Sequence, residues 1–188
     1  GASGIGRACV QLLGKLGALL VSLDRNRCDE ARLGPDVRQV EMDVCDRDGL
    51  AALAEDLAGQ GIRVDSLVNS AGILQAPVPP GDLGAETFAR VLAVDLQGTF
   101  NACAVFGSAM ARAGGGAIVN IASIAGMRSM PLHAYAPAKA GVISLTEGLA
   151  AEWGRSGGRV NAVSPGFTLT EALQAEIDQG RRDPQRLA

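Results

Sequence analysis

The chain opens with GASGIGRACVQLLGKLGALLVSLD (residues 1–24), and the order of features in this stretch decides the fold. A glycine-rich segment leads into an apolar pattern at helical spacing over Gly4–Leu16. A short apolar run over Ala18–Leu23 then ends in Asp24, as expected of a buried strand in a parallel sheet. Glycines at a helix start let the backbone approach a phosphate, because the helix N-terminus presents N–H groups and a positive dipole end. The stretch therefore predicts the first helix and strand of a nucleotide-binding α/β fold.

The acidic residue at the end of this strand indicates which nucleotide is bound. Asp24 follows the glycines by about twenty residues, where a carboxylate can accept hydrogen bonds from a ribose diol. The same carboxylate would repel a 2′-phosphate. We therefore expect NAD rather than NADP, a preference that the neighbouring Arg25 and Arg27 could soften.

Apolar runs and helical patterns alternate along the rest of the chain. Further strands are predicted at Val37–Met42, Val64–Asn69, Ala117–Ile121 and Arg159–Val163, and further helices at Gly49–Leu57, from about 86 to 112, and at Tyr135–Trp153. This alternation predicts βαβ units and a doubly wound parallel sheet in one α/β domain over residues 1–188. Ligands of such sheets bind beyond the carboxyl ends of the strands, where this sequence places Asp24, Asp43, Asn69, Ser123 and Pro165.

Composition argues against several other classes of protein. A net charge of −3 and the absence of a basic stripe argue against a nucleic-acid partner. The cysteines (Cys9, Cys28, Cys45, Cys103) lie too far apart for a zinc motif and suit a reducing cytosol. A single histidine argues against a histidine metal site or a Ser-His-Asp triad. No apolar run has transmembrane length, so we expect no membrane partner. Together with the cysteines and the single histidine, this predicts a cytoplasmic protein with no metal site.

One constellation of residues points to acid–base chemistry. The only tyrosine, Tyr135, lies four residues before Lys139 and twelve after Ser123. Positions i and i+4 of a helix share a face, so the phenol and the ammonium group can interact. A nearby positive charge lowers the pKa of a phenol, which is about 10 in isolation. Taken singly, a half-buried tyrosine, a solvated lysine and a turn serine would each be ordinary, but together they predict an acid–base enzyme.

These residues together resemble the short-chain dehydrogenase/reductase family over nearly the whole chain. Gly4-Ile5-Gly6 matches the end of its T-G-x-x-x-G-x-G motif, and Asn69-Ser70-Ala71-Gly72 resembles its N-N-A-G motif. Ser123, Tyr135 and Lys139 match the catalytic Ser and the Y-x-x-x-K motif. The family's adenine-contacting pair is similar to Asp43-Val44, and its nicotinamide-holding segment to Pro165-Gly166 with Thr168 and Thr170.

The resemblance implies hydride transfer between a nicotinamide and the carbon of a secondary alcohol or ketone. Tyr135 would be the general acid/base, Lys139 would lower its pKa and bind the nicotinamide ribose, and Ser123 would hydrogen-bond the substrate oxygen. The cofactor-binding residues that it implies are Ser3, Gly4, Ile5, Gly6, Asp24, Arg25, Asp43, Val44, Asn69, Ala71, Gly72, Tyr135, Lys139, Pro165, Gly166, Thr168 and Thr170.

The chain departs from the family at one catalytic position. The family usually has an asparagine in a stretch like N-L-x-G, which holds a water beside the lysine, whereas this chain has Asp95-Leu96-Gln97-Gly98. An ionised Asp95 could accept the same hydrogen bonds, but it adds a negative charge near Lys139. Asp95 is therefore a fourth candidate catalytic residue or, equally, a helix residue satisfied by the backbone or by water.

The substrate is specified less closely than the reaction. Met127, Arg128, His133 and Phe167 are expected to contact it, and Asp24 favours a polyol, a sugar or a similar small alcohol. The alternatives are a 3-oxoacyl reductase of fatty-acid type, although such enzymes mostly use NADPH, and a non-catalytic cofactor-binding scaffold or fragment. The family's first strand and last elements have no counterpart in the sequence, so we expect a chain that is incomplete at both ends. The resemblance also implies a homo-oligomer, a tetramer or a dimer.

Overall fold

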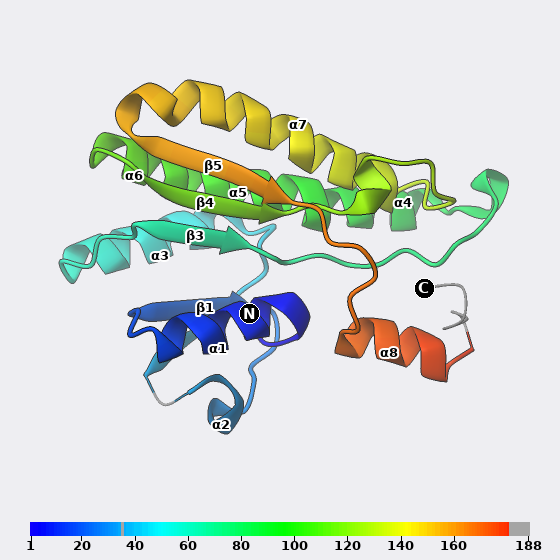
Figure 1. The fold of residues 1–188 in the computed structure, drawn as a ribbon, viewed down its shortest axis with the longest axis horizontal. Helices are drawn as coiled ribbons and strands as arrows, with labels where there is room; N and C mark the ends of the chain where they lie inside the picture. The colour runs from blue at the N-terminus through cyan, green and yellow to red at the C-terminus, as the bar shows by residue number, and fades with distance from the viewer. Residues whose placement is uncertain (35, 181–188) are drawn as a thin grey trace. The chain divides into compact units, whose positions relative to one another are not determined.

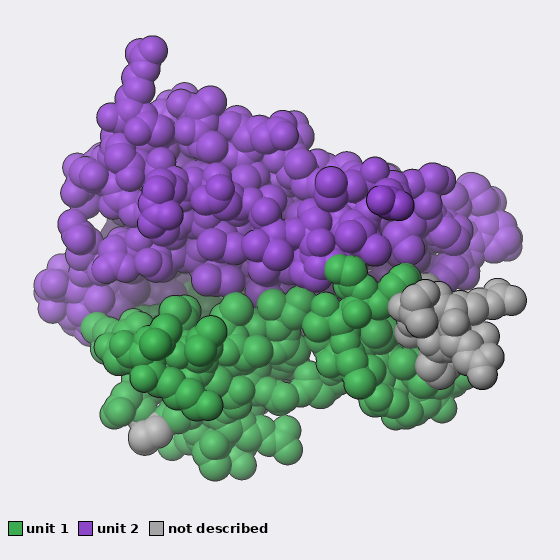
Figure 2. Space-filling model, viewed as in Figure 1, with its two compact units in different colours: residues 1–43, 166–188 green, residues 44–165 purple. Residues whose placement is uncertain are grey.

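The computed structural model describes residues 1–34 and 36–180, and the chain divides into two compact units, coloured separately in Figure 2. Unit 1 comprises Gly1–Asp43 and Gly166–Ala188, and unit 2 comprises Val44–Pro165. Each unit contains a sheet whose strands all run parallel, which confirms the expected α/β class with parallel strands. The expectation of a single domain is not tested by this division and stays a prediction.

Unit 1 is built from the glycine-rich start of the chain and a returning C-terminal segment. Helix α1 (Gly4–Lys15) packs on strand β1 (Leu20–Asp24), which pairs in parallel with β2 (Val37–Glu41). Two short helices were not expected, α2 (Glu30–Leu33) and α8 (Glu171–Asp178) (Figure 1). Each of these helices is preceded by a capping residue, Asp29 for α2 and Thr170 for α8. The side chain of each accepts a hydrogen bond from a backbone N–H of the first turn, which favours a helix start there.

Unit 2 is a three-stranded parallel sheet with helices packed against it. The strands β3 (Ser66–Asn69), β4 (Gly116–Ile121) and β5 (Gly158–Val163) lie in the order β3-β4-β5. Helix α3 (Arg47–Gly59), a long helix over residues 85–112 and helix α7 (Tyr135–Trp153) provide the packing, and the long helix contacts both others. Helix α7 has the bounds that the sequence predicts, and the remaining strands and helices lie where they were expected, with ends shifted by no more than a few residues.

The long helix contains two features that the sequence did not reveal. Its α-helical parts, α4 (Ala85–Leu92), α5 (Gly98–Ala102) and α6 (Ser108–Arg112), are joined by π-helical turns at Ala93–Gln97 and Cys103–Gly107. A π-helical turn is an uncommon widening of the helix that occurs often at functional sites. Asp95 lies in the first of these turns and Cys103 in the second.

No helix in the described ranges, 1–34 and 36–180, is long and apolar enough to cross a membrane. Within the same residues no group of three or more His, Cys, Asp or Glu side chains is arranged to hold a metal ion.

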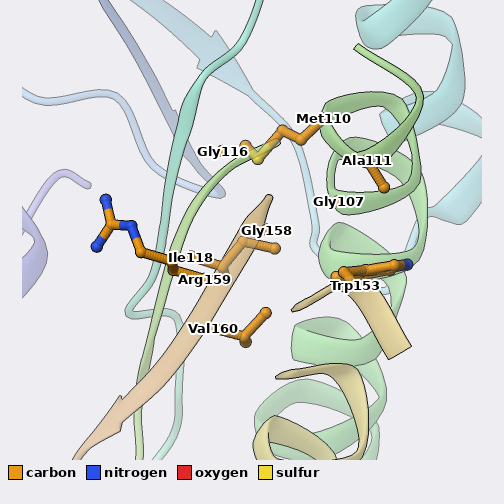
Figure 3. Close-up of a pocket in the computed structure, with 9 residues that line it drawn as sticks. All are labelled: Gly107, Met110, Ala111, Gly116, Ile118, Trp153, Gly158, Arg159 and Val160. Atoms are coloured by element: carbon orange, nitrogen blue, oxygen red, sulfur yellow. The ribbon is translucent and has the colours of Figure 1, made fainter. Parts of the chain in front are cut away.

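The end of unit 2 where β4 and β5 begin is held by close packing around the only tryptophan. Trp153 ends α7, and its ring lies against Gly107 of the long helix (Figure 3). A Cβ atom at Gly107 would lie 2.4 Å from the Trp153 ring and 2.9 Å from Ile118. The small cavity beside the ring, lined by Met110, Gly158 and Val160 among others, is therefore a packing feature and not a binding site.

This packing predicts that Gly107→Ala destabilises the protein by about 1–3 kcal/mol, because the added methyl group must displace a rigid ring in a filled core. Gly148→Ala in α7 is the matched control, because nothing lies within 4 Å of a Cβ there. Alanine is the better helix former, so the control should be neutral or stabilising by up to about 1 kcal/mol. Thermal unfolding followed by Trp153 fluorescence measures both, and equal effects would contradict the packing argument.

Candidate active site

Unit 2 brings together the four residues expected to be catalytic. Ser123 lies two residues beyond the end of β4, and Tyr135 and Lys139 stand one helical turn apart at the start of α7. Ser123 lies near the Tyr135 hydroxyl, where it favours the phenolate, and Lys139 Nζ lies 5.5 Å from the centre of the Tyr135 ring. Asp95 approaches the lysine from the long helix. The local geometry expected from the Ser/Tyr/Lys spacing is therefore present within one unit.

Lys139 and Asp95 form a buried ion pair. Lys139 is 4% exposed, and its Nζ donates a hydrogen bond to Ile121 O at 3.0 Å. Asp95 is fully buried, and its Oδ1 accepts a hydrogen bond from Ile73 N at 2.8 Å. The other oxygen, Oδ2, lies 3.4 Å from Lys139 Nζ, an ion-pair distance, but accepts no hydrogen bond. One oxygen of the pair thus retains free hydrogen-bonding capacity beside Lys139.

These contacts affect the pKa of Tyr135. Burial raises the pKa of Tyr135; the hydrogen bond with Ser123 opposes this, and the negative charge of Asp95 adds to it, so that the pKa lies above its ordinary value. The pKa of Tyr135 is therefore raised, with burial as the largest cause, and the lowering effect expected of Lys139 stays a prediction. Burial also raises the pKa of Asp95, against the opposing effects of Lys139 and the Ile73 N–H.

Glycine is required where two backbone segments pass the ion pair and the catalytic helix. A Cβ atom at Gly72, in the Asn69–Gly72 motif, would lie 3.0 Å from Asp95 Oδ2 and 3.4 Å from Lys139 Nζ. A Cβ atom at Gly126, just after Ser123, would lie 2.7 Å from Ala140 N in α7. Both segments therefore approach the site through their backbones, which keeps Ser123 and the Asn69–Gly72 motif close to α7.

A buried polar network supports the strand ends behind the site. Asn69 Nδ2 donates to Asn120 Oδ1 at 2.8 Å and also contacts Cys103 Sγ at 3.2 Å. Asn120 Nδ2 donates to Thr146 Oγ1 at 2.9 Å, which links β4 to α7. Burial raises the pKa of the Cys103 thiol to about 11, which disfavours the thiolate form.

Unit 1 contains the residues expected to hold the phosphate and ribose of a nucleotide. Gly4 has a φ of 53°, and its N–H, at the N-terminus of α1, donates to the Glu171 carboxylate at 2.9 Å. Arg7 forms an ion pair with the same carboxylate. A carboxylate therefore already lies where the helix end favours negative charge, which fits the group expected there. A cavity of about 680 Å³ beside Gly4 and Ile5 is lined by residues of α1, of α8 and of the segment between Thr168 and Glu171.

Asp24 is held rigidly at the end of β1. Its Oδ2 accepts a hydrogen bond from Ala2 N at 2.9 Å, and its Oδ1 accepts one from Asn26 N at 3.0 Å. Burial alone would raise the pKa of Asp24, but the hydrogen bonds from Ala2 N and Asn26 N act to lower it. The side chain is therefore an ionised acceptor, as recognition of a ribose diol requires.

The other expected residues lie at strand ends or in loops. Ser3 precedes α1 without a capping hydrogen bond from its side chain, and Asp43 follows β2. Val44 packs against Gly98 of the long helix. Pro165 O accepts a hydrogen bond from Ile124 N near Ser123. Of the expected substrate contacts, His133 is half-buried, and the exposed ones are Met127, Arg128 and Phe167.

Sequence reasoning did not identify Gln75, a buried residue beside the catalytic tyrosine. Its Oε1 accepts a hydrogen bond from Ala134 N at 2.7 Å and from Tyr135 N at 3.3 Å. The only signal in the sequence was an amide side chain in an otherwise apolar stretch, Ile73–Ala76.

The comparisons with known proteins agree with this geometry. A family model described as "Enoyl-(Acyl carrier protein) reductase" matches residues 1–186. The chain is 40% identical to a D-threitol dehydrogenase of Mycolicibacterium smegmatis, over 97% of this chain and 73% of that protein. A solved structure from Burkholderia xenovorans, described as a short-chain dehydrogenase/reductase, has a TM-score of 0.88 and 33% identity, over 95% of this chain and 71% of that one. The chain belongs to the short-chain dehydrogenase/reductase family.

Other members of the short-chain dehydrogenase/reductase family and similar structures carry different names. A galactitol 2-dehydrogenase of Rhizobium johnstonii is 37% identical over 100% of this chain and 77% of that protein. A Brucella melitensis structure described as a ribose-5-phosphate isomerase has 46% identity and a TM-score of 0.90, over 97% of this chain and 71% of that one.

Two similar structures contain a nicotinamide cofactor. One is 4-hydroxyisoleucine dehydrogenase complexed with NADH (32% identity, TM-score 0.82, 95% of this chain and 77% of that one). The other is ElxO with NADP bound (29% identity, TM-score 0.91, 100% of this chain and 79% of that one). Members of the family use a nicotinamide cofactor, and these two structures hold different ones.

The contact between Asp95 and Lys139 yields a direct prediction. Asp95→Asn should lower the pKa of Tyr135, because it removes a negative charge that disfavours the phenolate. Tyr135 is the only tyrosine, so the ultraviolet absorbance of tyrosinate during a pH titration reports this one side chain. Asp65→Asn, which removes an exposed carboxylate before β3, is the control and should leave the titration unchanged. An unchanged or raised pKa in Asp95→Asn would contradict the electrostatic assignment.

Proposed function

We propose that this protein interconverts a secondary alcohol and a ketone with NAD as cofactor, and that the alcohol is a polyol or a sugar alcohol. The observation that carries the proposal is the proximity of Ser123 and of the buried Lys139 to Tyr135. The similarity to threitol and galactitol dehydrogenases supports the substrate class.

The residues of unit 2 would handle the proton. In oxidation the ionised Tyr135 accepts the hydroxyl proton of the alcohol as the C–H bond releases a hydride, and in reduction the phenol returns that proton to the ketone oxygen. Ser123 donates a hydrogen bond to the same oxygen and stabilises the negative charge that develops there. Lys139 supplies a positive charge beside the phenol, and Asp95 fixes the position of that charge. When bound, the nicotinamide supplies the acceptor or donor of the hydride.

The cofactor would be held by the residues that the family resemblance implies. These are Ser3, Gly4, Ile5, Gly6, Asp24, Arg25, Asp43, Val44, Asn69, Ala71, Gly72, Tyr135, Lys139, Pro165, Gly166, Thr168 and Thr170. The Glu171 carboxylate on Gly4 N–H supports an anion site at the start of α1. The ionised Asp24 supports NAD over NADP.

A reductase acting on acyl-thioester substrates is the second candidate, favoured by the description of the matching family model. Asp24 favours the alcohol dehydrogenase, because its carboxylate favours NAD over NADP and 3-oxoacyl reductases mostly use NADPH. We further propose that the protein is cytoplasmic, because its four free cysteines fit a reducing compartment. The proposed oligomeric state is a homo-tetramer or a homo-dimer, as the family resemblance implies.

The central test is the loss of the phenol hydroxyl. Tyr135→Phe should lower kcat for the oxidation of D-threitol or galactitol by about 10²–10⁴-fold, because the general acid/base is removed. NADH affinity, measured by fluorescence titration, should change little. A variant that retains turnover would refute the proton-transfer role of Tyr135. If the parent protein binds NADH but oxidises neither polyol and reduces a 3-oxoacyl thioester, the acyl reductase is correct. If it binds NADH and converts none of these compounds, a non-catalytic scaffold is the better description.

Asp24 provides a test of cofactor choice. Asp24→Ser should reduce the ratio of NADH to NADPH affinity by about tenfold, which is about 1.4 kcal/mol, because the charge that repels a 2′-phosphate is lost. Glu55→Gln, which removes an exposed charge from α3, is the control and should leave the ratio unchanged. A parent protein that already prefers NADPH would overturn the assignment to NAD.

A further inference from the structure

The catalytic helix α7 has no capping side chain of its own. It begins at Tyr135, and the preceding residue, Ala134, has no side chain that could accept a hydrogen bond. Helices leave four backbone N–H groups at the N-terminus without partners inside the helix. Because Tyr135 is the first residue of the helix, the way in which these groups are satisfied decides where its backbone lies.

Each position of this first turn can be accounted for. Ala136 N donates to Leu132 O at 2.8 Å, and Pro137 has no N–H to satisfy. The two remaining donors, Ala134 N and Tyr135 N, both bond to Gln75 Oε1, at 2.7 and 3.3 Å. Gln75 thus takes the place of the missing cap, although it lies 60 residues before Tyr135 in the chain.

Water would not readily replace this amide. Gln75 is 3% exposed and Ala134 is fully buried, and Ala134 belongs to a core cluster with Val91 and Ala138. The other end of the amide is also engaged, since Nε2 donates to Ala76 O at 3.1 Å. Both polar ends of the side chain are therefore fixed, which orients Oε1 toward the helix.

The segment that contains Gln75 also contacts the Asp95–Lys139 pair, through Gly72 and Ile73. Gly72 lies against the Asp95–Lys139 pair, and Ile73 N donates to Asp95 Oδ1. Lys139, however, is anchored independently through Ile121 O. A loss of the contact at Gln75 would therefore displace the tyrosine while leaving the lysine in place.

We propose that Gln75 is a positioning residue for Tyr135: its side-chain oxygen fixes the first turn of α7 and so sets the phenol relative to Ser123 and Lys139. The proposal rests on the proposed role of Tyr135 as general acid/base. Removing the acceptor leaves two buried N–H groups unpaired at the residue that carries the reacting hydroxyl. Small displacements of a catalytic group lower turnover far more than they lower binding.

Three variants test this assignment. Gln75→Met keeps the shape but removes the acceptor, and it should lower kcat with D-threitol and NAD by about tenfold or more, while NADH affinity changes much less. Gln75→Glu keeps an acceptor at a helix N-terminus, where a carboxylate is favourable, but it loses the donor to Ala76 O, so it should retain more of kcat than Gln75→Met and less than the parent. Gln75→Asn withdraws the acceptor by one methylene and should fall between the two; it is the variant to use if Gln75→Met does not fold.

A second measurement does not depend on the substrate. The protein contains one tyrosine, so tyrosine labelled with carbon-13 at Cζ gives a single NMR resonance for Tyr135. We expect this resonance to be sharp in the parent and in Gln75→Glu, and shifted or broadened in Gln75→Met. Gln60→Met is the matched control: it also removes an amide hydrogen bond, from Nε2 to Asp56 Oδ1 at 2.9 Å, but at an exposed position. It should leave both measurements unchanged.

The outcomes separate this proposal from the proposed function. If Gln75→Met folds with an unchanged resonance and an unchanged kcat per folded molecule, or if Gln75→Glu loses as much as Gln75→Met, the positioning role is overturned. If the parent protein oxidises no polyol, the proposed function fails, and the tyrosine resonance still decides whether Gln75 holds Tyr135.

Discussion

The active site of this protein is organised around a charge that has been removed from water. Lys139 lies in the interior of unit 2, where an unpaired ammonium group would be costly, and two acceptors make its burial tolerable: Ile121 O and the Asp95 carboxylate. Losing one partner of such a pair typically costs about 3–5 kcal/mol, because the other charge is left uncompensated. The arrangement of the surrounding backbone follows from this demand. Gly72 leaves room for the Asp95–Lys139 pair because it has no Cβ atom, and the N–H of Ile73 donates a hydrogen bond to Asp95 Oδ1.

The Asp95 member of this pair also affects the pKa of Tyr135. A lysine beside a phenol is expected to favour the phenolate, but burial raises the pKa of Tyr135 and the negative charge of Asp95 adds to that rise. The asparagine that is usual at this position in the family carries no charge. The replacement by aspartate is therefore not a conservative change, because it alters the electrostatic balance of proton transfer while leaving the spacing of Ser123, Tyr135 and Lys139 intact.

The parts of this structure that sequence predicts well are those determined by local pattern. Helix α7 was found with its correct bounds because its ends coincide with Tyr135 and Trp153, next to clear changes in composition. Strand ends were located because polar residues follow apolar runs. What escaped prediction depends on partners far along the chain: the cap at Gln75, the burial that raises the pKa of Tyr135, and the π-helical turns. No propensity distinguishes a π-helical turn from the α-helix around it, because it is stabilised by tertiary packing.

The long helix places a constraint on chain length. Successive residues of an α-helix are rotated by about 100°, so deleting one residue within the α-helical part Gly98–Ala102 would turn every later side chain of this helix through that angle. Cys103 and Phe106 would leave the core, although the composition of the helix would hardly change. In the α-helical parts of residues 85–112 a substitution leaves this register unchanged, whereas a single-residue insertion or deletion changes it. The number of residues in this helix is thus as much a determinant of the active site as their identity.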